Sequence, residues 1–235
     1  MQKVSIIIPT YNEAKNLPLL IEEIYGLINK QETDIEFIIV DDNSPDGTGR
    51  VAEGLSRQYP IKVIHRPGKL GLGSAVIEGF KRSHRDILGV MDGDMSHDPA
   101  IINNLINALK DYDIAIGSRF EVESSINNWN WWRKIVSCSG VFLAKALTGV
   151  KDPLSGYFFL HRRIIDGVEL KTKGYKILFE ILVKCNYSKC KEIPYTFRMR
   201  QFSSSKLNYK EFLLFGSQIL SYGFYKIYKL FRRSY

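Results

Sequence analysis

Short apolar runs alternate with amphipathic segments along the first half of the chain. Five runs are apolar enough to form buried strands and span residues 4–8, 35–40, 61–65, 87–91 and 114–117. Four intervening segments have the apolar spacing typical of helices and span residues 16–27, 48–58, 73–83 and 99–110. Because continuous apolar runs mark strands buried on both faces, the alternation predicts a doubly wound parallel sheet with helices on both sides.

The pattern changes after about residue 120. We expect a helix over residues 133–147, a loop over 152–160 that enters a short strand, a helix over 174–183 and an edge strand over 192–198. These elements complete one domain over residues 1–207, with a first half at about 1–120 and a second half at about 121–207. Residues 208–235 remain as a basic and aromatic extension.

The composition is that of a folded protein, since 45% of the 235 residues are hydrophobic and 25% are charged. Cys138, Cys185 and Cys190 have neither the number of a disulfide framework nor the spacing of zinc ligands. This favours reduced thiols in a cytoplasmic setting. The chain has no apolar run of about 18 residues and its N-terminus enters a predicted strand directly, so we expect neither a membrane span nor a signal peptide.

The positive charge is concentrated toward the C-terminus. The whole chain has 33 Lys and Arg against 25 Asp and Glu. From Lys184 onward there are 11 basic and 2 acidic residues, whereas residues 1–183 carry 22 basic and 23 acidic residues. A basic extension predicts an anionic partner such as lipid headgroups, phosphate groups or nucleic acid.

The basic extension also has the pattern of an amphipathic helix. One helical face carries Leu220, Phe224, Ile227 and Phe231, and basic residues lie toward another face: Lys226, Lys229, Arg232 and Arg233. Such a helix binds in the membrane interface, where each basic residue near an anionic surface contributes about 1 kcal/mol. The alternative is a helix that packs on the protein's own sheet or that contacts another subunit.

Polar residues follow each of the first four predicted strands, and the most informative are Asp92-Gly93-Asp94 after the fourth. Two carboxylates two residues apart at a strand end point in roughly the same direction. Hard oxygen ligands there suit Mg²⁺ or Mn²⁺ bound together with substrate phosphates. An isolated Asp-x-Asp also fits a simple polar turn. Since open α/β sheets bind ligands at the carboxyl ends of strands, four such ends predict one shared pocket.

Eight segments, taken in order, resemble the inverting glycosyltransferases of family 2, and most closely the dolichyl-phosphate mannose synthases and their polyprenyl-phosphate relatives. The segments are Pro9-Thr10-Tyr11-Asn12-Glu13, Asp41-Asp42-Asn43-Ser44-Pro45-Asp46-Gly47-Thr48, Lys69-Leu70-Gly71-Leu72-Gly73, Asp92-Gly93-Asp94-Met95-Ser96-His97, Gly117-Ser118-Arg119, Arg133-Lys134-Ile135-Val136-Ser137, Asp152-Pro153-Leu154-Ser155-Gly156-Tyr157 and Ser205-Lys206-Leu207. The resemblance implies the nucleotide-sugar-binding (GT-A type) fold, with a nucleotide-sugar half at residues 1–120, an acceptor half at 121–207 and C-terminal amphipathic helices.

The resemblance also implies a donor site at the ends of the first, second and fourth predicted strands. The residues implied to bind the nucleotide sugar are Pro9, Tyr11, Glu13, Val40, Asp41, Asp42, Asp92, Arg200 and Lys206. Asp94 is implied as the direct ligand of a divalent ion, Mg²⁺ or Mn²⁺, that bridges the diphosphate, with Asp92 beside it. Ser96 is a further metal-ligand candidate, although some relatives carry Gln there and a hydroxyl is a poorer ligand.

The acceptor implied by the resemblance is a lipid monophosphate. Its phosphate oxygen is already ionised at neutral pH, which fits the lack of a convincing base carboxylate in the second half of the sequence. Arg119 and Arg133 are implied to bind this phosphate, for which a planar guanidinium is well suited, and Ser137 to contact it. The alternatives are that both arginines are ordinary surface residues, that Asp152 is only a loop residue and that His97 is structural.

The implied activity is that of a hexosyltransferase that moves mannose from GDP-mannose to a dolichyl or polyprenyl phosphate. The enzyme would bind peripherally or monotopically to the cytoplasmic face of a membrane, alone or with a membrane-spanning partner subunit. A UDP-glucose-dependent polyprenyl-phosphate glucosyltransferase is the alternative with the same loops. A module that binds nucleotides or nucleic acid without catalysis is disfavoured, because nucleic acid has no use for the acidic triplet, and we expect no nucleic-acid partner.

Overall fold

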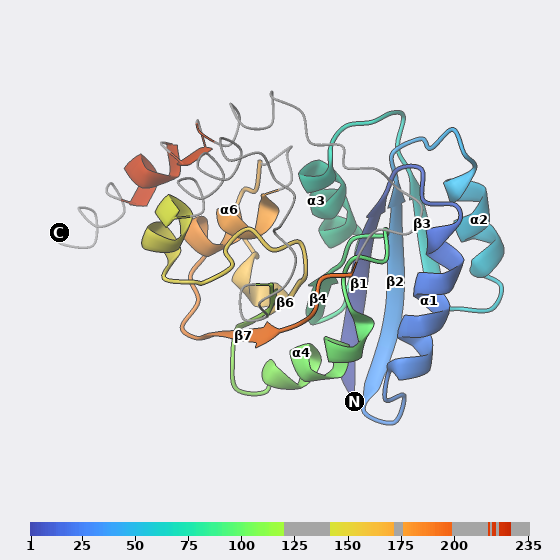
Figure 1. The fold of residues 1–235 in the computed structure, drawn as a ribbon, viewed down its shortest axis with the longest axis horizontal. Helices are drawn as coiled ribbons and strands as arrows, with labels where there is room; N and C mark the ends of the chain where they lie inside the picture. The colour runs from blue at the N-terminus through green and yellow to red at the C-terminus, as the bar shows by residue number, and fades with distance from the viewer. Residues whose placement is uncertain (120–141, 172–175, 199–215, 217, 220, 227–235) are drawn as a thin grey trace.

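A seven-stranded sheet forms the centre of the molecule (Figure 1). The computed structural model describes residues 1–119, 142–171, 176–198, 216, 218, 219 and 221–226. The strands lie in the order β3-β2-β1-β4-β6-β5-β7. Their bounds are β1 Gln2–Thr10, β2 Thr33–Asp41, β3 Ile61–His65, β4 Ile87–Val90, β5 Ile114–Ser118, β6 Phe158–His161 and β7 Cys190–Pro194.

Helices cover both faces of this sheet (Figure 1). One face is packed by α1 (Asn16–Leu27), α2 (Thr48–Leu55) and α4 (Ile102–Ala108), and the other by α3 (Leu72–Arg82) and α6 (Ile177–Lys184). The 3₁₀ helices η1 (Pro99–Ile101) and η2 (Arg162–Ile164) are short, and residues 142–148 are also helical. The predicted fold class, a doubly wound and mostly parallel α/β sheet, is therefore confirmed.

The central strand β1 shows why the first strand is an unbroken apolar run. Ile6 and Ile8 belong to the core beneath α1, whereas Ile7 belongs to the core beneath α3. All three side chains are fully buried, because alternate residues of a strand point to opposite faces and both faces are covered. α3 lies close to β1 at Gly79, where a Cβ atom would lie 2.5 Å from Ile7 Cγ2.

Within this mostly parallel sheet, β6 is the antiparallel strand. This strand lies between β4 and β5 and is antiparallel to both of them. β5 ends at Ser118, and the Gly117 N–H donates a hydrogen bond to the Tyr157 carbonyl (2.8 Å), so the chain enters β6 at the edge where it left β5. Because β6 starts at that edge, it runs antiparallel to β4 and β5. Its short apolar run does not reveal this direction.

Several element boundaries also differ from the predicted ones. The segment over residues 99–110 divides into η1 and α4, and the Asp98 side chain caps its start by accepting from the Ala100 N–H (3.0 Å). The strand expected over residues 192–198 is β7, which ends at Pro194 because its partner β5 ends at Ser118. Beyond this point Tyr195 keeps a single backbone hydrogen bond to the Ser118 carbonyl (3.1 Å).

Only part of the predicted C-terminal helix lies among the described residues, where residues 221–226 are helical. Ile219 and Tyr222 are buried, and the Tyr222 ring centroid lies 5.3 Å from that of Phe179 in α6. Phe224, in contrast, is 72% exposed. The buried side of this segment therefore packs on α6. The rest of the predicted helix over residues 208–235 and most of the predicted helix over 133–147 lie outside the described residues.

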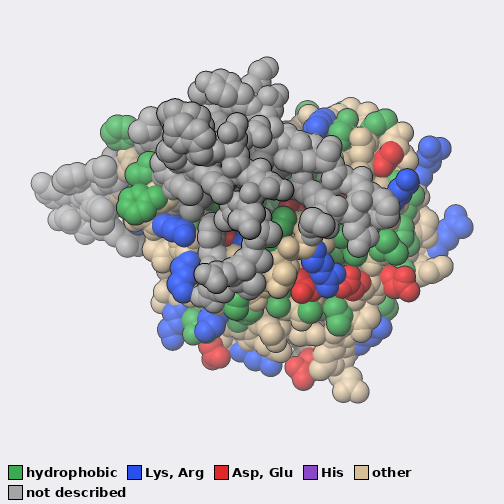
Figure 2. Space-filling model, viewed as in Figure 1, with side chains coloured by type: hydrophobic (Ala, Val, Ile, Leu, Met, Phe, Trp, Pro, Cys, Tyr) green, Lys and Arg blue, Asp and Glu red, His purple; other side chains and the backbone are tan. Residues whose placement is uncertain are grey.

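Basic and acidic side chains are interspersed over the described surface in the view of Figure 2. This distribution agrees with the near-balance of charges over residues 1–183. Among the helices that the described residues form, none combines the length and the apolar character needed to cross a membrane.

Candidate active site

The backbone turns through left-handed conformations just after β1, β2, β3 and β4. Asn12 (φ 60°), Asn43 (φ 54°) and Met95 (φ 65°) follow β1, β2 and β4, and they are the non-glycine residues with positive φ in the described part of the chain. Gly71 (φ 98°) follows β3 and precedes α3. Such conformations are costly for residues with a side chain and persist where the surroundings enforce them, often at functional sites. This edge of the sheet is therefore the candidate site.

Hydrogen bonds tie the loops after β1 and β2 into one wall. The Glu13 N–H donates to Thr48 Oγ1 (2.9 Å) and the Ala14 N–H donates to the Asp46 carboxylate (3.0 Å). Although its partial burial opposes ionisation, hydrogen bonds from Thr48 and Ala14 lower the pKa of Asp46. The two loops are thus held together before any ligand binds.

Asp41 and Asp42, which are implied to contact the nucleoside, both have partners inside the protein. Asp41 is buried and accepts from the Ser44 hydroxyl (2.5 Å) and the Ser44 N–H (3.1 Å). Its other contact is the Thr10 hydroxyl, which donates to it over 3.3 Å. Asp41 therefore fixes its own loop against the end of β1.

Asp42 connects the end of β2 with the loop that begins α3. It forms a buried ion pair with Arg66 (2.6 Å) and accepts from the N–H groups of Leu70 (3.0 Å) and Gly71 (3.1 Å). Both oxygens are engaged in these contacts, so Asp42 shapes the loop over residues 66–71. The sequence analysis did not anticipate this internal role.

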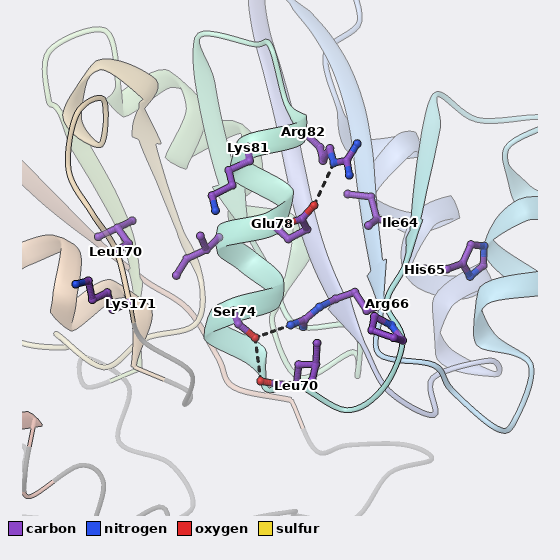
Figure 3. A pocket seen from close by; sticks show the side chains of 12 residues that line it. Ile64, His65, Arg66, Leu70, Ser74, Glu78, Lys81, Arg82, Leu170 and Lys171 are labelled. Carbon is purple, nitrogen blue, oxygen red and sulfur yellow. Dashed lines mark hydrogen bonds and ion pairs between the residues drawn. The ribbon is translucent and has the colours of Figure 1, made fainter.

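Arg66 also faces a cavity of about 440 Å³ between the end of β3, α3 and residues 170–171 (Figure 3). Its guanidinium donates to the Ser74 hydroxyl (2.6 Å), and Arg82 across the cavity pairs with Glu78 (3.1 Å). Lys81 and Lys171 also line this cavity.

The remaining nucleoside-pocket candidates lie on the same edge. Pro9 and Val40 are buried partners across β1 and β2. Tyr11, in the loop after β1, has the Lys69 Nζ 4.3 Å from its ring centroid. The Glu13 carboxylate accepts from Asn16 Nδ2 (2.7 Å) at the start of α1. The structure thus brings the loops after β1 and β3 together at Tyr11.

The acidic triplet follows β4, at the centre of this edge. Asp94 accepts from both the Ser96 N–H (3.1 Å) and the Ser96 hydroxyl (2.5 Å), and Ser96 is fully buried. Ser96 therefore orients Asp94. The side chain of Asp92 is 25% exposed, so this carboxylate lies at the surface of the site.

His97 contacts both the backbone and the carboxylate of Asp92. Its Nδ1 accepts from the Asp92 N–H (3.1 Å), which places the ring proton on Nε2, 3.7 Å from the Asp92 carboxylate. The buried imidazole stacks on the Tyr157 ring at 5.0 Å with an interplanar angle of 7°. The interpretation of His97 as a structural group fits this arrangement.

The backbone of Gly156 passes directly beside Asp92. A Cβ atom at this position would lie 3.3 and 3.4 Å from the two Asp92 oxygens and 3.3 Å from His97. The neighbouring Ser155 hydroxyl donates to the Gly117 carbonyl (2.7 Å) and fixes the turn on β5. A side chain at this position would therefore crowd the Asp92 carboxylate and the His97 ring.

Arg119 follows β5 and is held by Asp152, a residue the sequence left undecided between a functional and a loop role. Asp152 is fully buried and accepts from the Arg119 Nε (2.9 Å), Nη2 (2.8 Å) and backbone N–H (3.2 Å). Glu192 in β7 in turn accepts from the Asp152 N–H (2.8 Å). Although burial opposes its charge, the hydrogen bonds and the charge of Asp152 raise the pKa of Arg119. With its side chain 36% exposed, Arg119 is a fixed cation that solvent or a ligand reaches.

Tyr195 is a site residue that the sequence analysis missed. It follows β7, is 3% exposed and has a hydroxyl with no hydrogen-bond partner among the described residues. Because β7 is parallel to β5, the residue that follows β7 lies beside Arg119. The sequence signal is only that Tyr195 lies near the end of an apolar segment.

Four predicted site residues lie outside the described part of the chain: Arg133, Ser137, Arg200 and Lys206. The last described residue before two of them is Arg198, whose N–H donates to the Ser96 carbonyl (2.9 Å). The Arg198 side chain pairs with Asp98 (2.7 Å) and Glu23 (2.9 Å). The chain therefore leaves the described region next to the acidic triplet.

A divalent ion would rely on few protein ligands in the described region. No group of three or more His, Cys, Asp or Glu side chains in these residues has metal-binding geometry. Two carboxylates, the 25% exposed Asp92 and the buried Asp94, lie two residues apart at this edge. This set fits Mg²⁺ or Mn²⁺, which commonly bind through one or two carboxylates while water and substrate phosphates complete the coordination.

The mostly parallel sheet with helices on both faces is the fold of the GT-A type glycosyltransferases. Crystal structures of glucosyl-3-phosphoglycerate synthase from Mycobacterium tuberculosis share the fold. One, in complex with phosphoglyceric acid, superposes with a TM-score of 0.70 at 17% identity and covers 96% of this chain and 80% of that one. Another, in complex with Mn²⁺ and uridine-diphosphate-glucose, has a TM-score of 0.69 at 17% identity and covers 96% and 79%.

Residues 5–169 match Glycosyl transferase family 2, and the chain belongs to this family. A dolichol-phosphate mannosyltransferase from Pyrococcus furiosus is 45% identical over 215 residues, which are 88% of this chain. The chain spans 60% of that relative's length. The dolichol-phosphate mannosyltransferase of Saccharomyces cerevisiae is 31% identical, with 92% of this chain and 85% of the relative aligned. The polyprenol monophosphomannose synthase of Mycolicibacterium smegmatis is 34% identical, with 88% and 82% aligned. The predicted family is confirmed.

Proposed function

We propose that this protein is a hexosyltransferase that moves mannose from GDP-mannose to a dolichyl or polyprenyl phosphate, with inversion at the anomeric carbon. The observation that carries the proposal is the similarity to two dolichol-phosphate mannosyltransferases and a polyprenol monophosphomannose synthase over 88–92% of the chain. In this proposal residues 1–120 bind the donor, residues 121–207 bind the acceptor and residues 208–235 bind the membrane.

The reaction joins an acceptor phosphate oxygen to the anomeric carbon while the bond from that carbon to the diphosphate breaks. GDP leaves with the electron pair, and the acceptor needs no general base because its phosphate is already ionised. When bound, a divalent ion such as Mg²⁺ or Mn²⁺ offsets the charge that develops on the leaving diphosphate. Asp92 and Asp94 are the residues that would hold it, and Ser96 orients Asp94 for this task.

Arg119 is the described cation proposed to bind the acceptor phosphate. Its guanidinium is fixed by Asp152 and partly exposed. Because the side chain is already ordered, binding an anion costs little additional conformational entropy. Arg133 and Ser137 are proposed to complete the acceptor site, and Arg200 and Lys206 to close on the diphosphate. Tyr11, Pro9 and the other strand-end residues are proposed to surround the nucleoside.

A lipid acceptor requires contact with a membrane, and an exposed apolar platform suits this role. The apolar platform consists of Phe142, Leu143, Phe224 and Tyr225, of which Phe142 is 71% and Phe224 72% exposed. Its two helical segments are joined by a small core that includes Ala144 and Tyr222. We propose that this platform, with the basic residues near the C-terminus, binds the cytoplasmic face of a membrane.

The experiment that tests the activity compares donors. The purified chain is mixed with vesicles containing dolichyl phosphate, either GDP-mannose or UDP-glucose, and Mg²⁺ or Mn²⁺, and glycolipid formation is measured. We expect mannose transfer that stops when EDTA is added. Exclusive use of UDP-glucose would contradict the proposed donor, and no transfer from either donor would contradict the proposed activity.

Vesicle flotation tests the apolar platform. A Phe142→Ser, Phe224→Ser double variant should float less with anionic vesicles, whereas Leu19→Ser, which removes an exposed leucine (45%) of α1, should float like the unaltered chain. Equal flotation of all three would refute the platform. Absence of flotation in the unaltered chain would indicate that a membrane-spanning partner subunit is required.

A further inference from the structure

Tyr195 is placed at the acceptor side of the site by the pairing of β7 with β5. Pro194 is the register partner of Ser118, and the Tyr195 N–H donates to the Ser118 carbonyl (3.1 Å). Arg119 is the next residue along the chain from Ser118. Tyr195 and Arg119 therefore follow two neighbouring parallel strands and lie at the same edge of the sheet.

The Tyr195 ring is held by aromatic neighbours that leave little freedom of rotation. Its centroid lies 5.5 Å from that of Tyr157 at 89° and 5.8 Å from that of His97 at 86°. Phe197 lies 6.4 Å away. On the β5 side, Gly117 is close enough that a Cβ atom would lie 3.3 Å from the Tyr195 ring. A ring packed on these sides presents its hydroxyl in a fixed direction.

The hydroxyl itself is buried and lacks a hydrogen-bond partner among the described residues. Buried polar groups normally have partners, so one without a partner calls for an explanation such as a ligand. The neighbouring Tyr157 shows the usual case, since its hydroxyl donates to the Asp98 carbonyl (3.3 Å). The two tyrosines thus share one aromatic cluster but differ in what their hydroxyls bind.

The charges around Tyr195 indicate which ligand it suits. Burial raises the pKa of Tyr195, and the carboxylates of Asp152, Asp92 and Asp94 act in the same direction against the charge of Arg119. The phenol therefore stays protonated at neutral pH and is a hydrogen-bond donor.

We propose that the Tyr195 hydroxyl donates a hydrogen bond to a phosphate oxygen that Arg119 binds at the same time. This makes Tyr195 a phosphate-binding residue of the transfer reaction. The proposal rests on the proposed function, in which that oxygen belongs either to the acceptor monophosphate or to the donor diphosphate. A neutral donor adds a hydrogen bond here without adding charge to a site that already contains three carboxylates.

The test is Tyr195→Phe, which removes only the oxygen atom, with Tyr157→Phe as the matched variant. The melting temperature of Tyr195→Phe should equal or exceed that of the unaltered chain, because no internal hydrogen bond is lost. Tyr157→Phe should melt at a lower temperature, because it loses its bond to Asp98. This separates a ligand-binding hydroxyl from a structural one without measuring activity.

Binding is then measured by calorimetry with GDP plus Mn²⁺ and with a short-chain prenyl phosphate as separate probes. Tyr195→Phe should bind one probe about tenfold or more weakly, as expected for one lost hydrogen bond to an anion. Loss for the prenyl phosphate places the hydroxyl at the acceptor, and loss for GDP places it at the donor. Unchanged affinity for both, with the unaltered chain binding them, overturns this inference alone. If the unaltered chain binds neither probe, the inference and the proposed function both fail.

Discussion

The pair of Asp152 and Arg119 gives the sharpest test of the candidate site. Asp152→Asn keeps the shape of the side chain but turns one carboxylate oxygen into an NH₂ group that cannot accept a hydrogen bond. The guanidinium then loses one of the two bonds that fix its plane, at Nε (2.9 Å) or Nη2 (2.8 Å), and also loses the neutralising charge. We expect the transfer reaction to fall because Arg119 is no longer oriented.

The magnitude follows from the contacts. A hydrogen bond to a charged group contributes about 1.5–3 kcal/mol. Because the Arg119 side chain is 36% exposed, water partly replaces what is lost, and we expect the lower end of this range, about 1.5–2 kcal/mol, in the free energy of unfolding. The effect on kcat/KM should be larger, about 100-fold, since a displacement of about 1 Å in a positioning group has effects of that order.

The opposite end of β5 offers a matched control. Asp113 precedes this strand and accepts from Arg163 (2.7 Å) and from the N–H groups of Ser188 (2.7 Å) and Lys189 (3.1 Å). Asp113→Asn should therefore cost a similar free energy of unfolding, about 1–2 kcal/mol, with kcat/KM within about twofold of the unaltered value. Urea unfolding and mannose transfer are measured on both variants. If Asp152→Asn also kept its activity within twofold, the role assigned to Arg119 would be refuted.

Three further predictions concern the acidic edge and the loops beside it. Gly156→Ala should lower transfer activity about tenfold or more, because its Cβ would lie 3.3 and 3.4 Å from the Asp92 oxygens. Gly54→Ala in α2, whose Cβ would have no atom within 4 Å, should leave activity unchanged. Steady-state kinetics of the two variants test this prediction. Asp94→Asn should remain inactive when Mn²⁺ is restored to EDTA-treated protein, and recovery equal to that of the unaltered chain would exclude the metal role. The lowered pKa of Asp46 means that its stabilisation is complete above the ordinary carboxyl pKa and is lost as the pH falls through the lower folded value. The difference in thermal stability between the unaltered chain and Asp46→Asn should therefore shrink below about pH 4, and a constant difference down to pH 2 would contradict it.

Sequence patterns predicted the elements of the sheet well where burial alone decides them. β1 to β5 and the helices between them correspond to apolar runs and amphipathic segments. The runs are most continuous in strands covered on both faces, such as β4 and β5, whereas the edge strand β3 has exposed residues at Lys62 and His65. The direction of β6 depends instead on where the chain re-enters the sheet. An apolar run such as Phe158-Phe159-Leu160 is compatible with a parallel or an antiparallel strand. The direction of β6 therefore could not be predicted from the local sequence pattern.

The positions of the carboxylates in the candidate site could be predicted from the sequence, whereas the residues that pair with the site's charged side chains could not. Asp92 and Asp94 are recognisable because they directly follow a strand. The partner of Asp42 is Arg66, which is 24 residues away, and that of Arg119 is Asp152, which is 33 residues away. Such pairs arise from the packing of loops, for which the sequence carries no periodic signal. Tyr195 is the extreme case, because its role depends on an edge strand lying beside β5.

The balance of charges explains why the site needs more cations than the described residues provide near Arg119. The carboxylates of Asp152, Asp92 and Asp94 raise the pKa of the Tyr195 hydroxyl, whereas the charge of Arg119 lowers it. Three carboxylates and one guanidinium repel an anionic acceptor at short range, where the interior screens charges weakly. In the proposed function, a bound divalent ion and the basic residues Arg133, Arg200 and Lys206 would supply the additional positive charge that an acceptor phosphate requires. Tyr195 complements these cations as a neutral donor whose contribution does not weaken with salt.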